Sequence, residues 1–199
     1  RTLALSPGGA MLRVQGSPID QMSFLEEGGR LNVLVGADAQ GARMWAPQGK
    51  TGGLALLRVP LDEFGDASAR VRPMRYRALP GGSAEGSYWG LQNRYIGNWL
   101  VYGGNLPGAA YAVRIDRSDE DTNLPLSHGV ERIEAMGGDA VLVGSAQADL
   151  HLRSVALGKD ARLADEFVLP RMAQGDSRTH GFFYKPIASG DGVFGLPVV

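Results

Sequence analysis

Four arginines stand close together in the segment ARVRPMRYRALPG, at Arg70, Arg72, Arg75 and Arg77, and no acidic residue separates them. Guanidinium groups donate paired hydrogen bonds to carboxylates and phosphates, so such a cluster can bind an anionic ligand. The alternative is an edge strand that its charges and Pro73 keep from pairing with other sheets, and we favour this structural interpretation. A binding role for the cluster remains the competing hypothesis.

Aromatic side chains around two glycine-rich loops form a second candidate surface. Trp45, Tyr88 and Trp89 lie outside the regular apolar segments, and aromatic rings in such loops can stack on a sugar or on a partner's side chains. Trp99 lies inside an apolar run and is predicted to be core. The sequence thus predicts binding residues for a protein or carbohydrate ligand: Trp45, Tyr88, Trp89, Arg70 and Arg72.

The remaining polar residues give no pattern typical of catalysis or metal binding. His128, His151 and His180 show no metal-ligand spacing such as HxxxH. The run DRSDEDTN offers oxygen ligands suited to calcium but lacks the glycine and distal glutamate of an EF-hand, so we interpret it as a solvated connection. No GxSxG motif occurs, and spacing assembles no Ser, His and Asp set. We predict no catalytic residue, no metal site and no cofactor.

Composition restricts the class of protein. The 199 residues are 44% hydrophobic with a formal net charge of -1, which suffices for a buried core and disfavours nucleic-acid binding. The absence of cysteine excludes disulfides and thiolate metal sites. No apolar run approaches the roughly 20 residues that span a bilayer, so we predict no membrane span.

The elements that position the candidate residues follow a repeated phrase of glycine, a polar residue, an apolar run and glycine. It occurs as GGRLNVLVGA at 28–37, YIGNWLVYGG at 95–104 and GGDAVLVGSA at 137–146. Each phrase precedes a second apolar segment that carries an arginine: LALLRV, AAYAVRI or LHLRSV. Runs that are apolar on both faces are typical of buried strands. We therefore expect an all-β chain with helix below about 10%.

The spacing of the phrase indicates a β-propeller. Gly103 and Gly144 are 41 residues apart, and Phe183 lies about one further period along. Periods of about 40 to 50 residues with several strands each are typical of propeller blades, whose apolar faces stack on neighbours. Gly36 and Gly103 are 67 residues apart, so we expect looped insertions at QGKTGG and LPGGSAEGS. We predict about four-stranded antiparallel blades with a period near 40 residues, in one domain over residues 1–199 or in a propeller fragment.

The repeat also predicts equivalent residues. Three valines should be buried at matching positions of successive blades, with three arginines matched on the adjoining strands: Val35, Val101 and Val143, and Arg58, Arg114 and Arg153. The terminal segment GVFGLPVV has no following strand to cover it, so we expect an exposed apolar flank there. Self-association or a partner chain would complete such a propeller.

Two segments resemble a known family. SPIDQMSFLEEGGRLNVLVGA carries matching positions at Gln21, Met22, Ser23, Leu31 and Val33. RTHGFFYKPIASGDGVFGLPVV carries them at His180, Phe182, Phe183, Pro186, Gly195, Leu196 and Pro197. The chain resembles the secreted bacterial and archaeal proteins with a C-terminal β-propeller distantly related to WD40 repeats. This resemblance implies an exported propeller, secreted or periplasmic, and it transfers no catalytic residues.

These expectations together predict a non-catalytic binding or scaffolding β-propeller that acts outside the cytoplasm through loops at one end of its blades. The alternative is a propeller enzyme, a hydrolase or lyase, whose acids or metal ligands meet in the central channel from separate blades. Several Asp, Glu or His side chains meeting around an ion in that channel would favour the enzyme.

Overall fold

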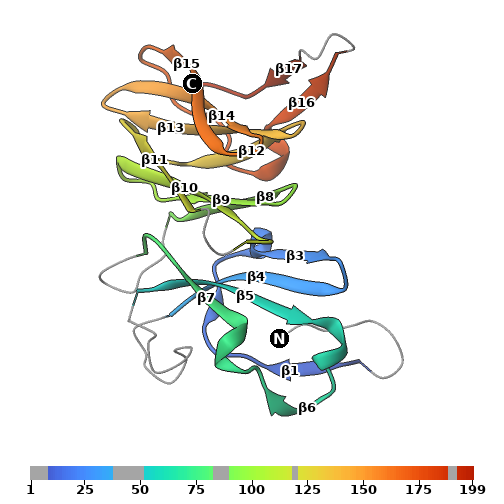
Figure 1. The fold of residues 1–199 in the computed structure, drawn as a ribbon. Helices are drawn as coiled ribbons and strands as arrows, with labels where there is room; N and C mark the ends of the chain where they lie inside the picture. Colours follow the sequence, from blue (N-terminus) through green and yellow to red (C-terminus); the bar gives the residue numbers. More distant parts are fainter. Residues whose placement is uncertain (1–8, 38–51, 83–89, 118–120, 188–191) are drawn as a thin grey trace. The chain divides into compact units, whose positions relative to one another are not determined.

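The computed structural model of the chain describes residues 9–37, 52–82, 90–117, 121–187 and 192–199. They fall into two compact units, residues 1–89 and 90–199, which are described separately (Figure 1). Strands account for 60% of the structure and helices for 7%, the latter as short 3-10 turns. The expected all-β class is therefore confirmed.

The first unit contains a five-stranded antiparallel sheet around β4 (Arg30–Gly36). On one side β4 pairs with β5 (Leu54–Pro60), which pairs with β7 (Tyr76–Leu79). On the other side β4 pairs with two short strands, β2 (Ser17–Pro18) and β3 (Phe24–Glu27), which the 3-10 turn η1 (Gln21–Ser23) separates. Asp20 caps this turn because its carboxylate accepts a hydrogen bond from the Met22 amide at 2.7 Å.

A second sheet of this unit joins β1 (Met11–Arg13) in parallel to β6 (Asp66–Arg70). β6 belongs to an insertion between β5 and β7 that also contains η2 (Leu61–Glu63) and η3 (Pro73–Arg75). This insertion explains part of the long spacing between the first two phrases. The expected insertions at QGKTGG and LPGGSAEGS lie partly outside the described residues.

One apolar cluster packs the two-stranded sheet of β1 and β6 against the five-stranded sheet. Leu12 of β1 and Val71, which follows β6, are buried against Val33 and Val35 of β4 and Leu57 of β5. Burial of such a side chain contributes roughly 1.5–3 kcal/mol. The position of β1 and β6 is thus determined by the core as well as by their own hydrogen bonds.

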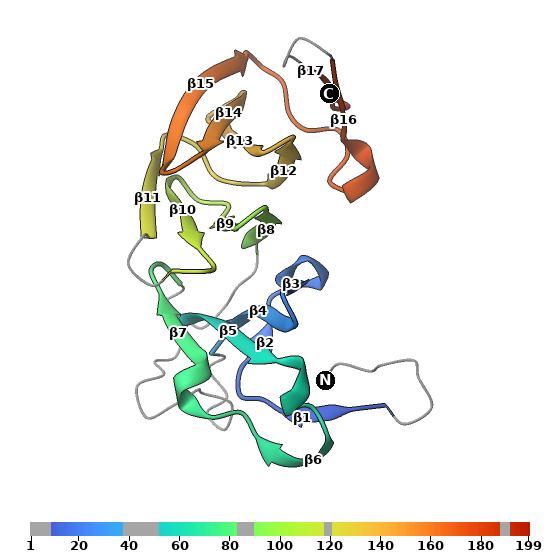
Figure 2. The same cartoon turned by 45° about the vertical axis from the view of Figure 1, so that its right-hand side comes forward.

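The second unit contains two antiparallel four-stranded meanders of the same strand order (Figure 2). The first consists of β8 (Gln92–Ile96), β9 (Trp99–Gly103), β10 (Gly108–Arg114) and β11 (Asp121–Leu126). The second consists of β12 (Arg132–Met136), β13 (Asp139–Ala146), β14 (Asp149–Leu157) and β15 (Ala161–Leu169). The starts of β8 and β12 are 40 residues apart, as are those of β9 and β13 and of β11 and β15. The structure thus contains a 40-residue repeat in this unit.

The two meanders bury their facing sides against each other. Trp99 and Val101 of the first lie in one apolar cluster with Ala140, Leu142 and Val155 of the second. All five side chains are buried. Stacking of this kind hides the apolar faces that a single sheet leaves in water.

The C-terminal segment packs on the other face of the second meander. It contains η4 (Thr179–Gly181) and a hairpin of β16 (Phe183–Pro186) and β17 (Gly192–Gly195). Phe182 and Leu196 lie against the buried residues of β13 and β14. Other apolar side chains of this segment are exposed, as expected for the terminal flank: Phe183, Val193, Phe194, Val198 and Val199.

The predicted matching of individual residues was wrong. In the first meander Val101 pairs with Arg94, and the residue 40 positions after Arg94 is Glu134. Glu134 pairs with Val141, so Val141 is the equivalent of Val101. Val143 instead pairs with Arg132. The arginines do not match either, since Arg58 lies opposite Asn32, Arg114 opposite Trp99 and Arg153 opposite Leu142. The prediction aligned Gly103 with Gly144, but Gly103 ends the short β9 whereas Gly144 lies inside the longer β13.

Candidate functional site

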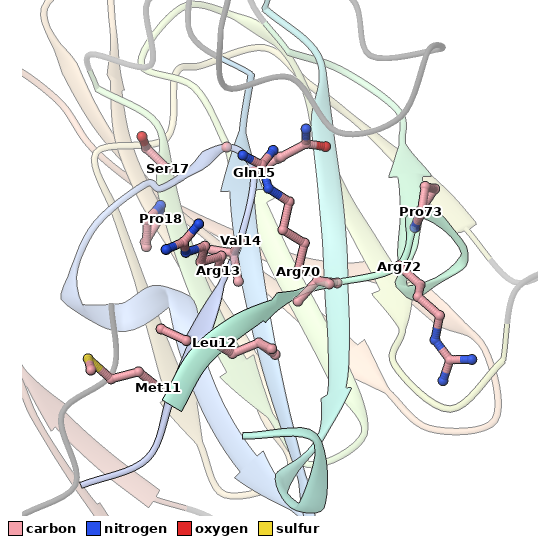
Figure 3. Close-up of a pocket in the computed structure, with 13 residues that line it drawn as sticks. Met11, Leu12, Arg13, Val14, Gln15, Ser17, Pro18, Arg70, Arg72 and Pro73 are labelled. Carbon is pink, nitrogen blue, oxygen red and sulfur yellow. The ribbon is translucent and has the colours of Figure 1, made fainter. Parts of the chain in front are cut away.

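An open groove in the first unit runs along β1 and past the end of β6 (Figure 3). Its volume is about 1110 Å³, and its walls are residues 11–18 on one side and Ala67 with residues 70–73 on the other. Two of the sequence-predicted binding residues, Arg70 and Arg72, line this groove. The other three, Trp45, Tyr88 and Trp89, lie outside the described residues.

Hydrogen bonds along one edge hold the wall formed by residues 11–18. The Val71 amide donates to the Arg13 carbonyl at 2.9 Å. The Gln15 amide donates to the Tyr76 hydroxyl at 2.8 Å, and that hydroxyl donates back to the Gln15 carbonyl at 3.2 Å. Burial raises the pKa of Tyr76, so the hydroxyl keeps the proton that it donates. Gly16 follows with φ of 79°, a turn conformation that favours glycine.

Two arginines in the groove form no ion pair within the part of the chain that the structure describes. Arg13 and Arg70 are direct register partners across β1 and β6, and both are exposed. Neither forms an ion pair with a carboxylate of the described chain. The pKa of Asp66 is lowered mainly because Ser68 donates hydrogen bonds to its carboxylate, and Arg13 contributes only at longer range. Like charges directly opposite each other destabilise a strand pair, so an anion bound between them would relieve the repulsion.

Arg72, unlike Arg70, forms an ion pair with a described carboxylate. Its Nη2 atom lies 3.2 Å from Oε1 of Glu63, a carboxylate that Arg75 also contacts. These guanidinium groups lower the pKa of Glu63, and the hydrogen bond from Arg75 is the largest cause. In Figure 3 the guanidinium of Arg72 points away from Arg13 and Arg70. The structure therefore places Arg70 next to Arg13 and not next to Arg72. Arg13 was not among the predicted binding residues, because in the sequence it is only one charged residue within the apolar segment MLRVQG.

Leu12 of β1 and Val14, which follows β1, border a small apolar pocket. Its lining contains Leu12 and Val14 from the β1 wall together with Phe24 and Phe64. Val14 and Phe24 are 38% and 41% exposed. Charged and apolar surfaces thus meet along one short stretch of backbone.

Two stacked histidines form a separate cluster in the second unit. The ring of the buried His128 lies 5.1 Å from that of His151, centroid to centroid. His128 donates through Nδ1 to the Gly129 carbonyl at 2.7 Å, so its buried Nε2 carries a lone pair, and this atom has no hydrogen-bond partner among the described residues. Glu166 joins the cluster through contacts of 2.9 Å with His151 Nδ1 and 2.6 Å with Arg153 Nη2. Burial lowers the pKa of His128 and keeps its ring neutral.

The histidine cluster does not have the composition of a metal centre. Across the described ranges, no group of three or more His, Cys, Asp or Glu side chains is placed to hold a metal ion. The contacts of His128 are a backbone carbonyl and a stacked ring, which position the connection between the two meanders.

A buried arginine ties the C-terminal segment to β12. Arg132 donates from Nη1 to Glu134 at 2.9 Å and from Nε to Gln174 at 2.5 Å. Its Nη2 atom donates to the carbonyls of Asp176 at 2.6 Å and Arg178 at 2.8 Å. The side chain therefore donates to one carboxylate, one side-chain amide oxygen and two backbone carbonyls, which is a structural role.

The described residues contain no helix long and apolar enough to cross a membrane. The fold and the groove define an all-β protein with four-stranded antiparallel meanders and an arginine-lined groove on its first unit. Comparison of the chain with family models, with curated proteins and with solved structures finds no match.

Proposed function

We propose that this protein is a non-catalytic binding module of the β-propeller class that acts outside the cytoplasm, and that its groove binds carboxylate or phosphate groups of an acidic ligand. The observation that carries this proposal is the pair Arg13 and Arg70, which lie opposite each other in an open groove and form no ion pair with a described carboxylate. Guanidinium groups recognise both kinds of anion through paired, charge-assisted hydrogen bonds.

The composition of the groove supports binding rather than catalysis. Its lining, as far as the described residues form it, contains no histidine, cysteine, aspartate or glutamate that could act as a general base. Gln15 and Ser17 add neutral donors beside the arginines. Such a site can orient an anionic group but has no residue with which to activate a nucleophile.

The repeat supports the propeller architecture. Two successive four-stranded meanders with a 40-residue repeat stack face to face, as neighbouring blades do. The C-terminal hairpin exposes apolar side chains. Their exposure supports the proposal that a second copy of the protein or a partner chain covers this flank.

Two anionic polymers test the groove. Fluorescein-labelled poly-L-glutamate supplies carboxylates, and inorganic polyphosphate is the competitor that supplies phosphates. We expect poly-L-glutamate to raise the fluorescence anisotropy, with an affinity that falls as salt is added. The relative strength of competition by polyphosphate identifies which anion the site prefers.

Charge-matched variants make the test specific. Replacing both groove arginines, Arg13→Ala with Arg70→Ala, should weaken binding by about tenfold or more, equivalent to about 1.4 kcal/mol. A double variant elsewhere removes the same number of charges and serves as the control: Arg162→Ala on the exposed side of β15, combined with Arg117→Ala beyond β10, should change the affinity by less than about twofold. Equal binding by the two double variants would overturn the proposal.

A further inference from the structure

We infer that the free edge of β1 binds an extended peptide in which acidic and apolar residues alternate, and that this peptide adds to β1 as a further strand. The inference rests on the proposed function, because the acidic side chains of the peptide lie on the face of β1 that carries Arg13, one of the two arginines of the proposed anion site. It adds the class of ligand and the mode of binding.

The first observation concerns the backbone of β1. Met11 exchanges backbone hydrogen bonds with Gly65 at 2.6 and 3.0 Å, and Arg13 accepts from Val71 at 2.9 Å, so both residues use the edge that faces the insertion. In an extended strand the N–H and C=O groups of one residue point to the same edge, and those of the next residue point to the opposite edge. The N–H and C=O groups of Leu12 and Val14 therefore point to the other edge, where no backbone partner occurs in the described part of the chain. An open strand edge is a template for a further strand.

The second observation is the charge on one face of this edge. Residues directly opposite each other in paired strands project from the same face of the sheet. A ligand residue opposite Arg13 therefore places its side chain beside Arg13, on the face that also carries Arg70 one strand further away. Neither guanidinium group forms an ion pair with a carboxylate of the described residues, so this face favours an acidic ligand residue. Every second residue of the peptide lies on this face.

The third observation is the apolar surface on the opposite face. A ligand residue opposite Val14 projects toward Val14 and Phe24, whose side chains are partly exposed above the pocket that they line with Phe64. An apolar residue there removes these exposed surfaces from water. The two faces together require alternation of acidic and apolar residues, and backbone pairing supplies the affinity common to strand-addition complexes.

The experiment uses two synthetic octapeptides of identical composition. One alternates glutamate and valine, and the other has four glutamates followed by four valines; both are acetylated and amidated. We expect the alternating peptide to bind the full chain at least about tenfold more tightly. It should also slow hydrogen exchange of the Leu12 and Val14 amides, a readout that charge attraction alone does not give.

Backbone methylation tests strand pairing directly. Methylation of the valine amides and methylation of the glutamate amides leave charge and hydrophobicity in place, but only one set of amides faces β1. We expect one methylated peptide to lose binding and the other to keep it; the set that abolishes binding also distinguishes parallel from antiparallel pairing. On the protein, Val14→Pro removes the Val14 N–H group that points to the free edge, and this variant should not bind the peptide. An unchanged circular dichroism spectrum would show that the variant is folded.

The outcomes separate this inference from the proposed function. If both octapeptides bind equally and the Arg13 and Arg70 variants bind neither, the anion site stands and strand addition is overturned. If neither octapeptide binds and poly-L-glutamate also fails, both proposals fall. Protection of Leu12 and Val14 in a dimer of the protein without peptide would assign the edge to a second copy and would likewise overturn the inference.

Discussion

Arg13 and Arg70 are direct neighbours across the parallel pairing of β1 and β6, so two positive charges face each other, and neither forms an ion pair with a carboxylate of the described residues. Cross-strand pairs of like charge destabilise a sheet. The small sheet is nevertheless anchored, because Leu12 and Val71 beside the two arginines are buried in the core of the first unit. The proposed anion site is thus also a place of local repulsion between like charges.

We predict that Arg70→Glu stabilises the protein while it abolishes binding of acidic probes. The new carboxylate would face Arg13, which replaces repulsion with attraction and should add roughly 0.2–1 kcal/mol to the free energy of unfolding. Urea denaturation measures the change, and 1 M NaCl should reduce it because the pair is exposed. A destabilised variant, or a gain that salt leaves unchanged, would contradict the repulsion between Arg13 and Arg70.

Arg132→Ala should destabilise the second unit strongly. The substitution leaves the carbonyls of Asp176 and Arg178 without this donor, and the buried Glu134 carboxylate keeps only its contact with Arg94 at 3.2 Å. A buried polar group left without its partner costs about 1–3 kcal/mol. Chemical denaturation measures the loss, and limited proteolysis should show faster cleavage near residues 171–178. Arg162→Ala, an exposed arginine on β15, is the matched control and should change stability by less than about 0.5 kcal/mol.

Acidification should destabilise the protein through His128. Burial lowers the pKa of this residue in the folded state, so the unfolded chain binds a proton more readily. The stabilising contribution is complete above the unfolded pKa of about 6.5 and is lost as pH falls through the folded value. The groups facing the ring are His151, Glu166 and Arg153, and the pKa of Glu166 is itself lowered, chiefly by the hydrogen bond from His151.

Unfolding titrations at pH 7.5 and pH 5.5 test the role of His128. The His128→Asn variant should lose less stability on acidification than the unsubstituted protein, because position 128 then takes up no proton. His180→Asn replaces an exposed histidine and should leave the pH dependence as it was. Identical pH dependence in all three proteins would show that His128 does not contribute.

Gly144→Ala should be poorly tolerated. A Cβ atom at Gly144 would lie 1.7 Å from the Gly129 carbonyl oxygen, and a backbone atom cannot move aside as a flexible side chain does. Overpacking of this kind costs about 1–3 kcal/mol or more. Gly138→Ala is the matched control, since nothing lies within 4 Å of its new atom. Thermal unfolding of the two variants should differ clearly, and equal midpoints would refute the close contact.

The C-terminal hairpin should promote self-association at micromolar concentrations. Val193 is 52% exposed and Phe183 59% exposed, on a segment whose further apolar residues are also in water. Val193→Ser should shift the elution volume and the scattered mass toward the monomer, because less apolar surface gains from contact. Gel filtration with light scattering makes the comparison. A monomeric unsubstituted protein at every concentration would count against this prediction.

The all-β class could be predicted from the sequence because its signals are local. Glycine punctuation and runs apolar on both faces define strands without knowledge of their partners. The repeat of about 40 residues followed from the same phrases, and the starts of β8 and β12 show it directly. Trp99 was likewise predicted as core from its place in an apolar run, and it is 3% exposed.

Register and long-range neighbours were decided only by the tertiary structure. Aligning Gly103 with Gly144 misplaced the equivalents of Val101, because strands of different length place their glycines at different distances from the hairpin turn. The partnership of Arg13 with Arg70 depends on a parallel pairing between distant segments, and alternation within a strand specifies its two faces but not the strand beside it. The sequence thus determined which residues form strands, whereas packing of the core determined which strands, and hence which charges, lie together.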